Sequence, residues 1–119
     1  MSFAADTEKL IEQLIQAEYK NACEKFGYKY NSLHEGYAVL LEEIEEVKNE
    51  ITQLLNSFDV FWLWVKRNNQ VHTYLCVEDM YEATENAISE LAQVGAVLMK
   101  IKNTISEMKE NDAVYKESM

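Results

Sequence analysis

The feature that most constrains this chain is a shortage of turn residues: it has no proline and only three glycines in 119 residues. A sheet-based domain needs frequent turns, and turns draw on glycine and proline, so the composition argues against an all-β fold. Residues that favour helices, such as Glu, Leu, Ala and Lys, are abundant instead. The length suits one domain with its own core. We therefore predict a single all-α domain over residues 1–119.

Capping and breaking residues divide the chain into helical segments. Gly27 is expected to end a first helix. Ser32 and Glu35 have the spacing of a capping box at the start of a second helix, which we expect to end at Asn56-Ser57. The predicted helices are residues 7–25, 32–55, 58–66 and 71–110, with any break in the last one between 68 and 79, and the polar tail 111–119 is expected to fray.

Apolar residues recur at helical spacing in both long segments. The predicted core stripe of the second helix comprises Tyr37, Leu41, Ile44, Val47, Ile51 and Leu55. That of the last helix comprises Tyr81, Thr84, Ala87, Ile88, Leu91, Val94, Leu98, Ile101, Ile105 and Met108. The segment Phe58–Val65 is apolar nearly all round, so it is either a short buried helix or a surface that packs against a second subunit. Its two tryptophans suggest more burial than one small domain provides, and we therefore expect an oligomer.

The net charge of −10 limits the partners. Such a surface repels nucleic acid and anionic membrane, so a polyanionic ligand such as a nucleotide would need metal ions to bridge it to the protein. Cys23 and Cys76 lie far apart without a CxxC pattern and are expected to be reduced, buried thiols of a cytoplasmic protein. The N-terminus does not resemble a signal peptide, and the apolar run Val60–Val65 is too short to span a bilayer.

Carboxylates crowd one side of the second predicted helix. Glu46 follows Glu42 by four residues and Glu43 by three, so all three can point towards one place. Each like-charge pair at this spacing costs about 0.2–0.5 kcal/mol, which a bound divalent cation would remove. A solvated acidic face explains the same pattern without any ligand. Glu90 would add a carboxylate if the last helix packs antiparallel to this one.

Other site chemistries find little support. Gln93 and Lys100 follow Glu90 on one side of the last helix, where Lys100 suits a phosphate, or belongs to a solvated edge. His34 and His72 are the only histidines, and neither lies in a Glu-x-x-His pattern, which disfavours zinc, di-iron and histidine-based catalytic sites. A di-iron protein would need His72 beside the glutamates. Ligands that are all oxygen favour Mg²⁺ or Mn²⁺.

Two motifs resemble those of a known family. Leu41-Glu42-Glu43-Ile44-Glu45-Glu46 is similar to the Glu-Glu-x-x-Glu motif of the MazG-like all-α nucleoside triphosphate pyrophosphohydrolases. Glu90-Leu91-Ala92-Gln93 falls where that family carries Glu-x-x-Asp, and the surrounding residues resemble its phage and prophage branch. The resemblance implies an antiparallel helical bundle of four-helix type, assembled as a dimer or tetramer. It also implies Mg²⁺-dependent cleavage of an NTP or dNTP to the monophosphate and pyrophosphate, with housekeeping of the nucleotide pool as the biological role.

The resemblance also assigns roles to single residues. The expected ligands of Mg²⁺ are Glu43, Glu46 and Glu90, while Glu42 would hold a second metal or orient the attacking water. Lys100 would bind a phosphate. Two tryptophans, Trp62 and Trp64, either flank the base or belong to the core or an interface.

Gln93 departs from the family pattern, because a neutral amide is a poorer Mg²⁺ ligand than the expected aspartate. The alternative function is therefore a catalytically weak or inactive bundle that binds metal or nucleotide, or serves as a protein-interaction module.

Overall fold

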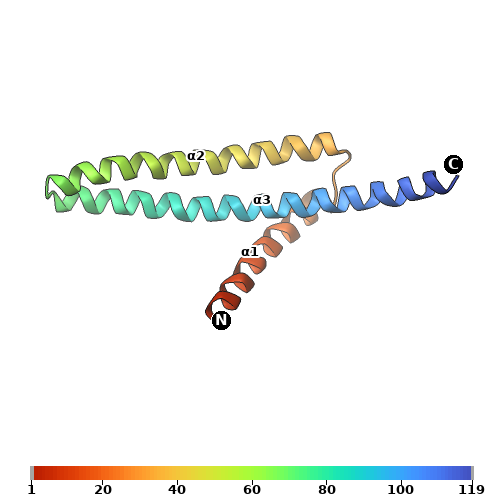
Figure 1. Ribbon diagram of the computed structural model, residues 1–119, viewed down its shortest axis with the longest axis horizontal. Coiled ribbons are helices and arrows are strands. Elements are labelled where there is room, and N and C mark those ends of the chain that lie inside the picture. Colours follow the sequence, from red (N-terminus) through yellow and green to blue (C-terminus); the bar gives the residue numbers. More distant parts are fainter. Residues whose placement is uncertain (1, 119) are drawn as a thin grey trace. The chain divides into compact units, whose positions relative to one another are not determined.

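The computed structural model describes the backbone of residues 2–118 and the side chains of residues 4–110. It contains three helices, α1 (Ser2–Phe26), α2 (Leu33–Lys66) and α3 (Gln70–Ser118), and residues 2–118 contain no strand (Figure 1). The predicted all-α class is confirmed. The prediction that residues 111–119 fray stays a prediction, because their side chains and the last residue lie outside the part of the chain that the structure describes.

Local signals explain how α1 ends and α2 begins. Gly27 has a φ of 85°, which a glycine adopts without strain, and its N–H donates to the Cys23 carbonyl at 2.9 Å. The Ser32 hydroxyl accepts from the N–H of Glu35 at 3.1 Å, as the capping box predicts. The Glu35 carboxylate accepts from the Asn31 side chain instead of reaching back to the Ser32 N–H.

The predicted end of a helix at Asn56-Ser57 is wrong, because α2 runs without interruption to Lys66. Asn and Ser only weakly oppose a helix, and Ser57 is half-buried within α2. The turn comes later, where Asn68 has a φ of 55°. The side-chain oxygen of Asn69 accepts from the N–H of His72 at 3.0 Å and so caps α3, which has no break between residues 70 and 79.

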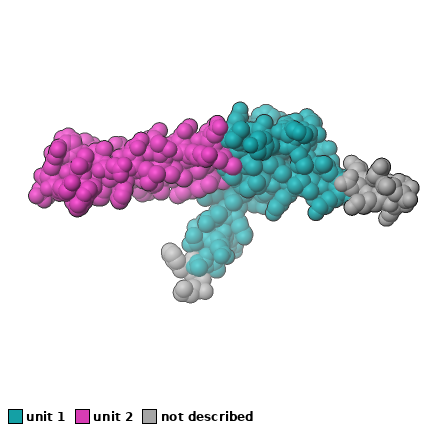
Figure 2. Space-filling model, turned by 45° about the horizontal axis from the view of Figure 1, so that its top comes forward, with its two compact units in different colours: residues 1–42, 92–119 teal, residues 43–91 magenta. Residues whose placement is uncertain are grey.

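The chain divides into two compact units, which Figure 2 shows in different colours. Unit 1 consists of residues 1–42 and 92–119, and unit 2 of residues 43–91. Glycines allow close helix packing in unit 1. A Cβ at Gly95 would lie 2.9 Å from three side-chain atoms of Ile15, and one at Gly36 would lie 3.0 Å from Ile101.

Buried hydrogen bonds hold the segment before α2 against α3 in unit 1. The buried Thr104 hydroxyl accepts from the Tyr30 N–H at 3.0 Å and donates to the Lys100 carbonyl at 2.9 Å. The amide of the preceding residue, Asn103, donates to the Tyr19 hydroxyl at 2.7 Å and to the Tyr28 carbonyl at 2.8 Å. These bonds satisfy backbone groups that the loop cannot pair by itself.

Unit 2 is an antiparallel hairpin of residues 43–66 of α2 and 70–91 of α3 (Figure 1). Its buried and half-buried helical residues alternate at spacings of three and four, which defines one seam between the two helices. The seam residues are Glu43, Val47, Glu50, Leu54, Ser57, Phe61 and Trp64 on α2, and Thr73, Cys76, Met80, Ala83, Ala87 and Glu90 on α3.

Within unit 2, most of the side chains predicted as core lie one position after this seam. On α2, Val47 is buried as expected, but Leu55 is 56% exposed. On α3, Tyr81 is 66% and Ile88 is 52% exposed. The segment Phe58–Val65 is part of α2, and most of its large apolar side chains are exposed as well. The seam within one chain therefore holds smaller and more polar residues than the apolar pattern suggested.

Candidate metal centre

Three carboxylates meet in unit 2. Glu43 and Glu46 are three residues apart on α2, so they project from one side of that helix, and Glu90 approaches from α3. One oxygen from each side chain lies within 4.8 Å of the other two. The predicted meeting of these residues, which required α3 to pack antiparallel to α2, is thus confirmed. We call these three residues the glutamate cluster.

The cluster opposes the ionisation of Glu90. Its pKa is raised to about 7, first by a hydrogen bond with Glu46, then by burial, and then by the negative charges of Glu46, Glu43 and Glu50. Two carboxyl groups can hydrogen-bond only if one of them keeps its proton. Near neutral pH, the cluster therefore either holds a proton or gains from a nearby positive charge.

The geometry of the cluster fits a hard cation. Neighbouring oxygens around Mg²⁺ are about 3 Å apart and opposite ones about 4.2 Å apart, and opposite oxygens around Ca²⁺ are about 4.6–5.2 Å apart. The three oxygens of the cluster, which lie within 4.8 Å of one another, must therefore draw closer to share one ion. The Oε2 atom of Glu90 is buried, and no N–H or O–H of the described residues donates to it. A buried oxygen without a donor is one that a cation would satisfy, and three carboxylate ligands favour Mg²⁺, Mn²⁺ or Ca²⁺ over softer metals.

A polar hollow of about 290 Å³ lies farther along the same hairpin. It is lined by Gln53, Asn56, Ser57, Asp79, Glu82, Ala83 and Asn86. Asn86 is one turn from Glu90 on α3, and its amide donates to Glu50 of α2 at 3.5 Å. The sequence pattern did not predict this hollow or a role for Glu50, because Asn56-Ser57 was interpreted as the end of a helix. The available signal was the recurrence of amide and carboxylate side chains every three or four residues.

The other predicted site residues of the motifs belong to unit 1. Glu42 is exposed and Gln93 is half-buried. The predicted phosphate ligand, Lys100, is only 4% exposed, and its Nζ lies 4.4 Å from the centre of the Tyr30 ring. A second ring, that of Phe26, lies 6.0 Å from the same nitrogen. The roles of Glu42, Gln93 and Lys100 stay predictions.

The structure does not bring the tryptophans to the glutamate cluster within one chain. Trp62 is about 24 Å from Glu46 along the continuous α2 helix. It is 57% exposed and carries Lys66 over its ring, whereas Trp64 stacks on His72 with ring centres 4.2 Å apart. His72 is therefore not beside the glutamates, which removes the basis for a di-iron site.

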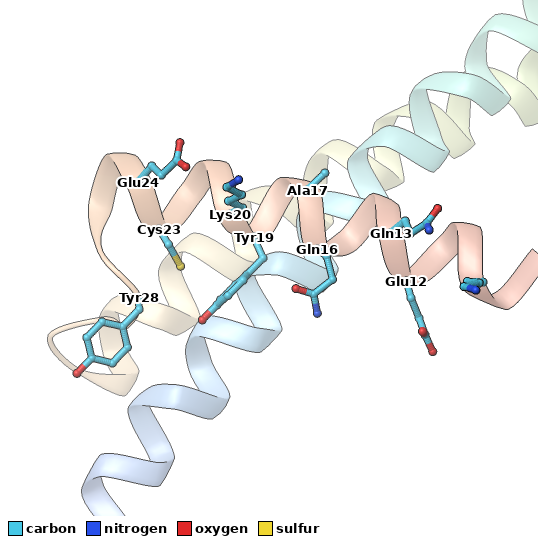
Figure 3. A pocket seen from close by; sticks show the side chains of 10 residues that line it. Glu12, Gln13, Gln16, Ala17, Tyr19, Lys20, Cys23, Glu24 and Tyr28 are labelled. Carbon is cyan, nitrogen blue, oxygen red and sulfur yellow. The ribbon is translucent and has the colours of Figure 1, made fainter.

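A larger hollow, of about 940 Å³, lies along α1 in unit 1. Figure 3 shows that its lining comes from one side of α1 and from Tyr28. The lining includes two lysines, Lys9 and Lys20, and two glutamates, Glu12 and Glu24. Because these charges balance, this hollow has no preference for an anionic group such as a phosphate.

Comparison with protein-family models, curated proteins and solved structures finds no match to this chain. Within the described residues, every helix is too short or too polar to cross a bilayer.

Proposed function

We propose that this protein is a Mg²⁺-dependent nucleoside triphosphate pyrophosphohydrolase, which converts an NTP or dNTP and water to the monophosphate and pyrophosphate. The observation that supports this most is the glutamate cluster, in which two helices bring three carboxylates within 4.8 Å. The Glu-Glu-x-x-Glu resemblance supplies the reaction class. A dimer or tetramer that acts on the cytoplasmic nucleotide pool completes the proposal.

Each part of the chain has a distinct task in this reaction. The glutamate cluster holds the cation with its carboxylate oxygens. When bound, Mg²⁺ neutralises phosphate charge and lowers the pKa of a water molecule. Glu42 would orient the attacking water molecule or accept its proton as the water attacks the α-phosphorus and pyrophosphate leaves. Lys100 binds a phosphate, and Gln93 contributes its amide to the substrate.

The polar hollow offers a place for the nucleoside. Its amide side chains, from Gln53, Asn56 and Asn86, can both donate and accept hydrogen bonds, as the edge of a nucleobase requires. Asp79 and Glu82 would repel phosphate, so the triphosphate end of a bound nucleotide would point away from them and towards the cation. The hollow therefore complements the glutamate cluster instead of competing with it.

Pyrophosphate release tests this proposal directly. The purified chain is incubated with each ordinary and modified dNTP and NTP, with Mg²⁺, with Mn²⁺ and with EDTA. We expect metal-dependent release from at least one substrate. Glu43→Gln, Glu46→Gln and Glu90→Gln should each lower kcat/KM by at least 100-fold, whereas the matched control Glu45→Gln, an exposed carboxylate on α2, should stay within threefold of the unchanged chain.

Two results would contradict the proposal: no release from any nucleotide, or release that the three variants leave unchanged. The second result would place the chemistry elsewhere in the chain.

Gln93 favours a second candidate, a bundle that binds metal or nucleotide without turnover. The family pattern has a carboxylate at this position, and an amide contributes no charge to a cation site. Titration calorimetry with Mn²⁺ separates the two functions. Binding that Glu90→Gln abolishes, together with no pyrophosphate release, supports the second candidate. Gln93→Asp should then introduce or increase turnover.

A further inference from the structure

The polar hollow of unit 2 lies where the seam between the two helices contains small residues. Ser57 of α2 and Ala83 of α3 both line it, whereas the preceding seam residues, Leu54 and Met80, are larger. Ala83 is only 4% exposed and Ser57 is half-buried, so these two residues form the floor of the hollow. The other lining residues are exposed and form its walls.

The walls of the hollow accept more hydrogen bonds than they donate. On α3 they carry two carboxylates, Asp79 and Glu82, which only accept when they are ionised. On α2 they carry the amides of Gln53 and Asn56, which both donate and accept. Among the described residues, no basic side chain lines the hollow or forms an ion pair with either carboxylate. The hollow therefore favours a ligand edge that is rich in N–H donors.

Glu82 lies at the distance from the glutamate cluster that a nucleotide spans. It precedes Glu90 by eight residues, which is about 12 Å along α3. On α2, Gln53 follows Glu46 by seven residues, which is about 10.5 Å. Both lengths are close to that of an extended nucleoside monophosphate, measured from the phosphate to the far edge of the base. A nucleotide held through its phosphates at the cation therefore brings its base edge to Glu82, whereas Asp79 lies nearly one turn beyond it.

Guanine presents more donors to such a wall than any other common base. Its N1–H and its N2 amino group lie side by side, so that one carboxylate can accept from both. Adenine and cytosine each place a single amino group beside a ring nitrogen that accepts. Uracil and thymine have one N–H between two carbonyls, which a carboxylate repels. The O6 carbonyl of guanine needs a donor, and Gln53 can supply it, because the Asn86 amide already donates to Glu50.

We propose that Glu82 selects guanine nucleotides, because its carboxylate accepts hydrogen bonds from N1–H and from the N2 amino group of the base. Gln53 donates to O6 from the opposite wall of the hollow. This inference rests on the proposed function for the position of the triphosphate, and it adds the identity of the base. Glu82 determines specificity and takes no part in breaking the phosphoanhydride bond.

Binding of nucleotides that resist cleavage tests the base preference separately from turnover. The α,β-methylene analogues of dGTP, dATP, dCTP and dTTP are titrated into the full chain with Mg²⁺ by calorimetry. We expect the guanine analogue to bind at least about 10-fold more tightly than the thymine analogue, with the other two between them. Glu82→Gln should lower the guanine affinity at least about 10-fold and raise the thymine affinity, because an amide both donates and accepts. The matched control Glu85→Gln, an exposed carboxylate on α3 outside the hollow, should leave all four affinities unchanged.

Three results would overturn the inference: no analogue binds, another base binds as tightly as guanine, or Glu82→Gln keeps the guanine preference. The unchanged chain alone decides the first two, so the test does not depend on the folding of a variant. Pyrophosphate release, measured in parallel, separates this inference from the proposed function. Guanine preference in a chain that releases no pyrophosphate contradicts only the proposed function. Metal-dependent release that is equal for all bases contradicts only the inference about Glu82.

Discussion

The carboxyl groups of Glu46 and Glu90 come from different helices and lie within 4.8 Å of each other, close enough for Glu46 to raise the pKa of Glu90. This proximity favours a proton on Glu90 that a carboxylic acid ordinarily loses well below neutral pH. Its consequences for stability and for metal binding can be measured separately.

The first prediction concerns pH in metal-free buffer. The pKa of Glu90 is about 7 in the folded chain and near 4.5 when unfolded, so the folded state holds more protons between these values. The stabilising contribution is complete below about pH 4.5 and is lost as pH rises through 7. In EDTA, the free energy of unfolding of the unchanged chain should fall by on the order of 1 kcal/mol between pH 5 and 8, a value discounted because Glu90 is partly exposed. Urea unfolding should show that this fall is absent in Glu90→Gln and present in the control Glu45→Gln. The same fall in Glu90→Gln as in the unchanged chain would contradict the prediction.

The second prediction concerns cations. Mg²⁺, Mn²⁺ or Ca²⁺ should replace the proton on Glu90 and stabilise the folded state, because the cation binds only where the three carboxylates meet. At ten times its Kd, the metal should raise the Tm by about 5 °C. Differential scanning fluorimetry or calorimetry at pH 7.5 measures the shift, with KCl at equal ionic strength as the control. The rise in Tm should disappear in Glu43→Gln and persist in Glu45→Gln. Equal rises in the two variants would contradict the prediction and would indicate nonspecific screening of surface charge by the cation.

The third prediction concerns helix packing in unit 1. In Gly95→Ala, the new Cβ would lie 2.9 Å from three atoms of Ile15, so that side chain must move. Overpacking costs about 1–3 kcal/mol, and helix propensity returns about 1 kcal/mol, so we expect a net loss of about 1 kcal/mol. In an Ile15→Ala background the same change should stabilise the chain. Urea unfolding of this double-mutant cycle gives the sign, and destabilisation in both backgrounds would reject the assigned contact.

The fourth prediction concerns a buried hydroxyl. Thr104→Val keeps the shape of the side chain but leaves the buried Tyr30 N–H without its acceptor. We expect a loss of about 1–3 kcal/mol in the free energy of unfolding. Thr84→Val is the matched control, because Thr84 is exposed and bonds only to the Met80 carbonyl of its own helix. That change should stay within about 0.5 kcal/mol. Similar losses for the two variants would show that the Tyr30 bond contributes little.

Local chemistry explains the parts of the fold that the sequence predicts well. Gly27 and Ser32 act through their own backbone and side chain, so their positions suffice to place the end of α1 and the start of α2. The meeting of Glu43, Glu46 and Glu90 required only helical spacing and an antiparallel partner.

The seam was missed by one residue for a physical reason. The largest apolar side chains were assumed to face inward within one chain, whereas Leu55 is 56% and Tyr81 is 66% exposed. A hydrophobic pattern shows that a face is to be covered, but not whether the same chain covers it. The position of the polar hollow depends on the register of two helices, which the turn near Asn68 determines and a single-helix pattern does not contain.

The placement of Trp62 and Trp64 determines what intrinsic fluorescence can report. The chain has only these two tryptophans, and both lie in the last turns of α2. Trp64 is stacked on His72, so its emission follows the closure of the hairpin turn, whereas Trp62 is exposed and would shift to shorter wavelength when covered. Events at Glu46, about 24 Å away along the helix, would leave both signals nearly unchanged. Fluorescence therefore monitors assembly and opening of the hairpin end, and ligand occupancy needs another probe.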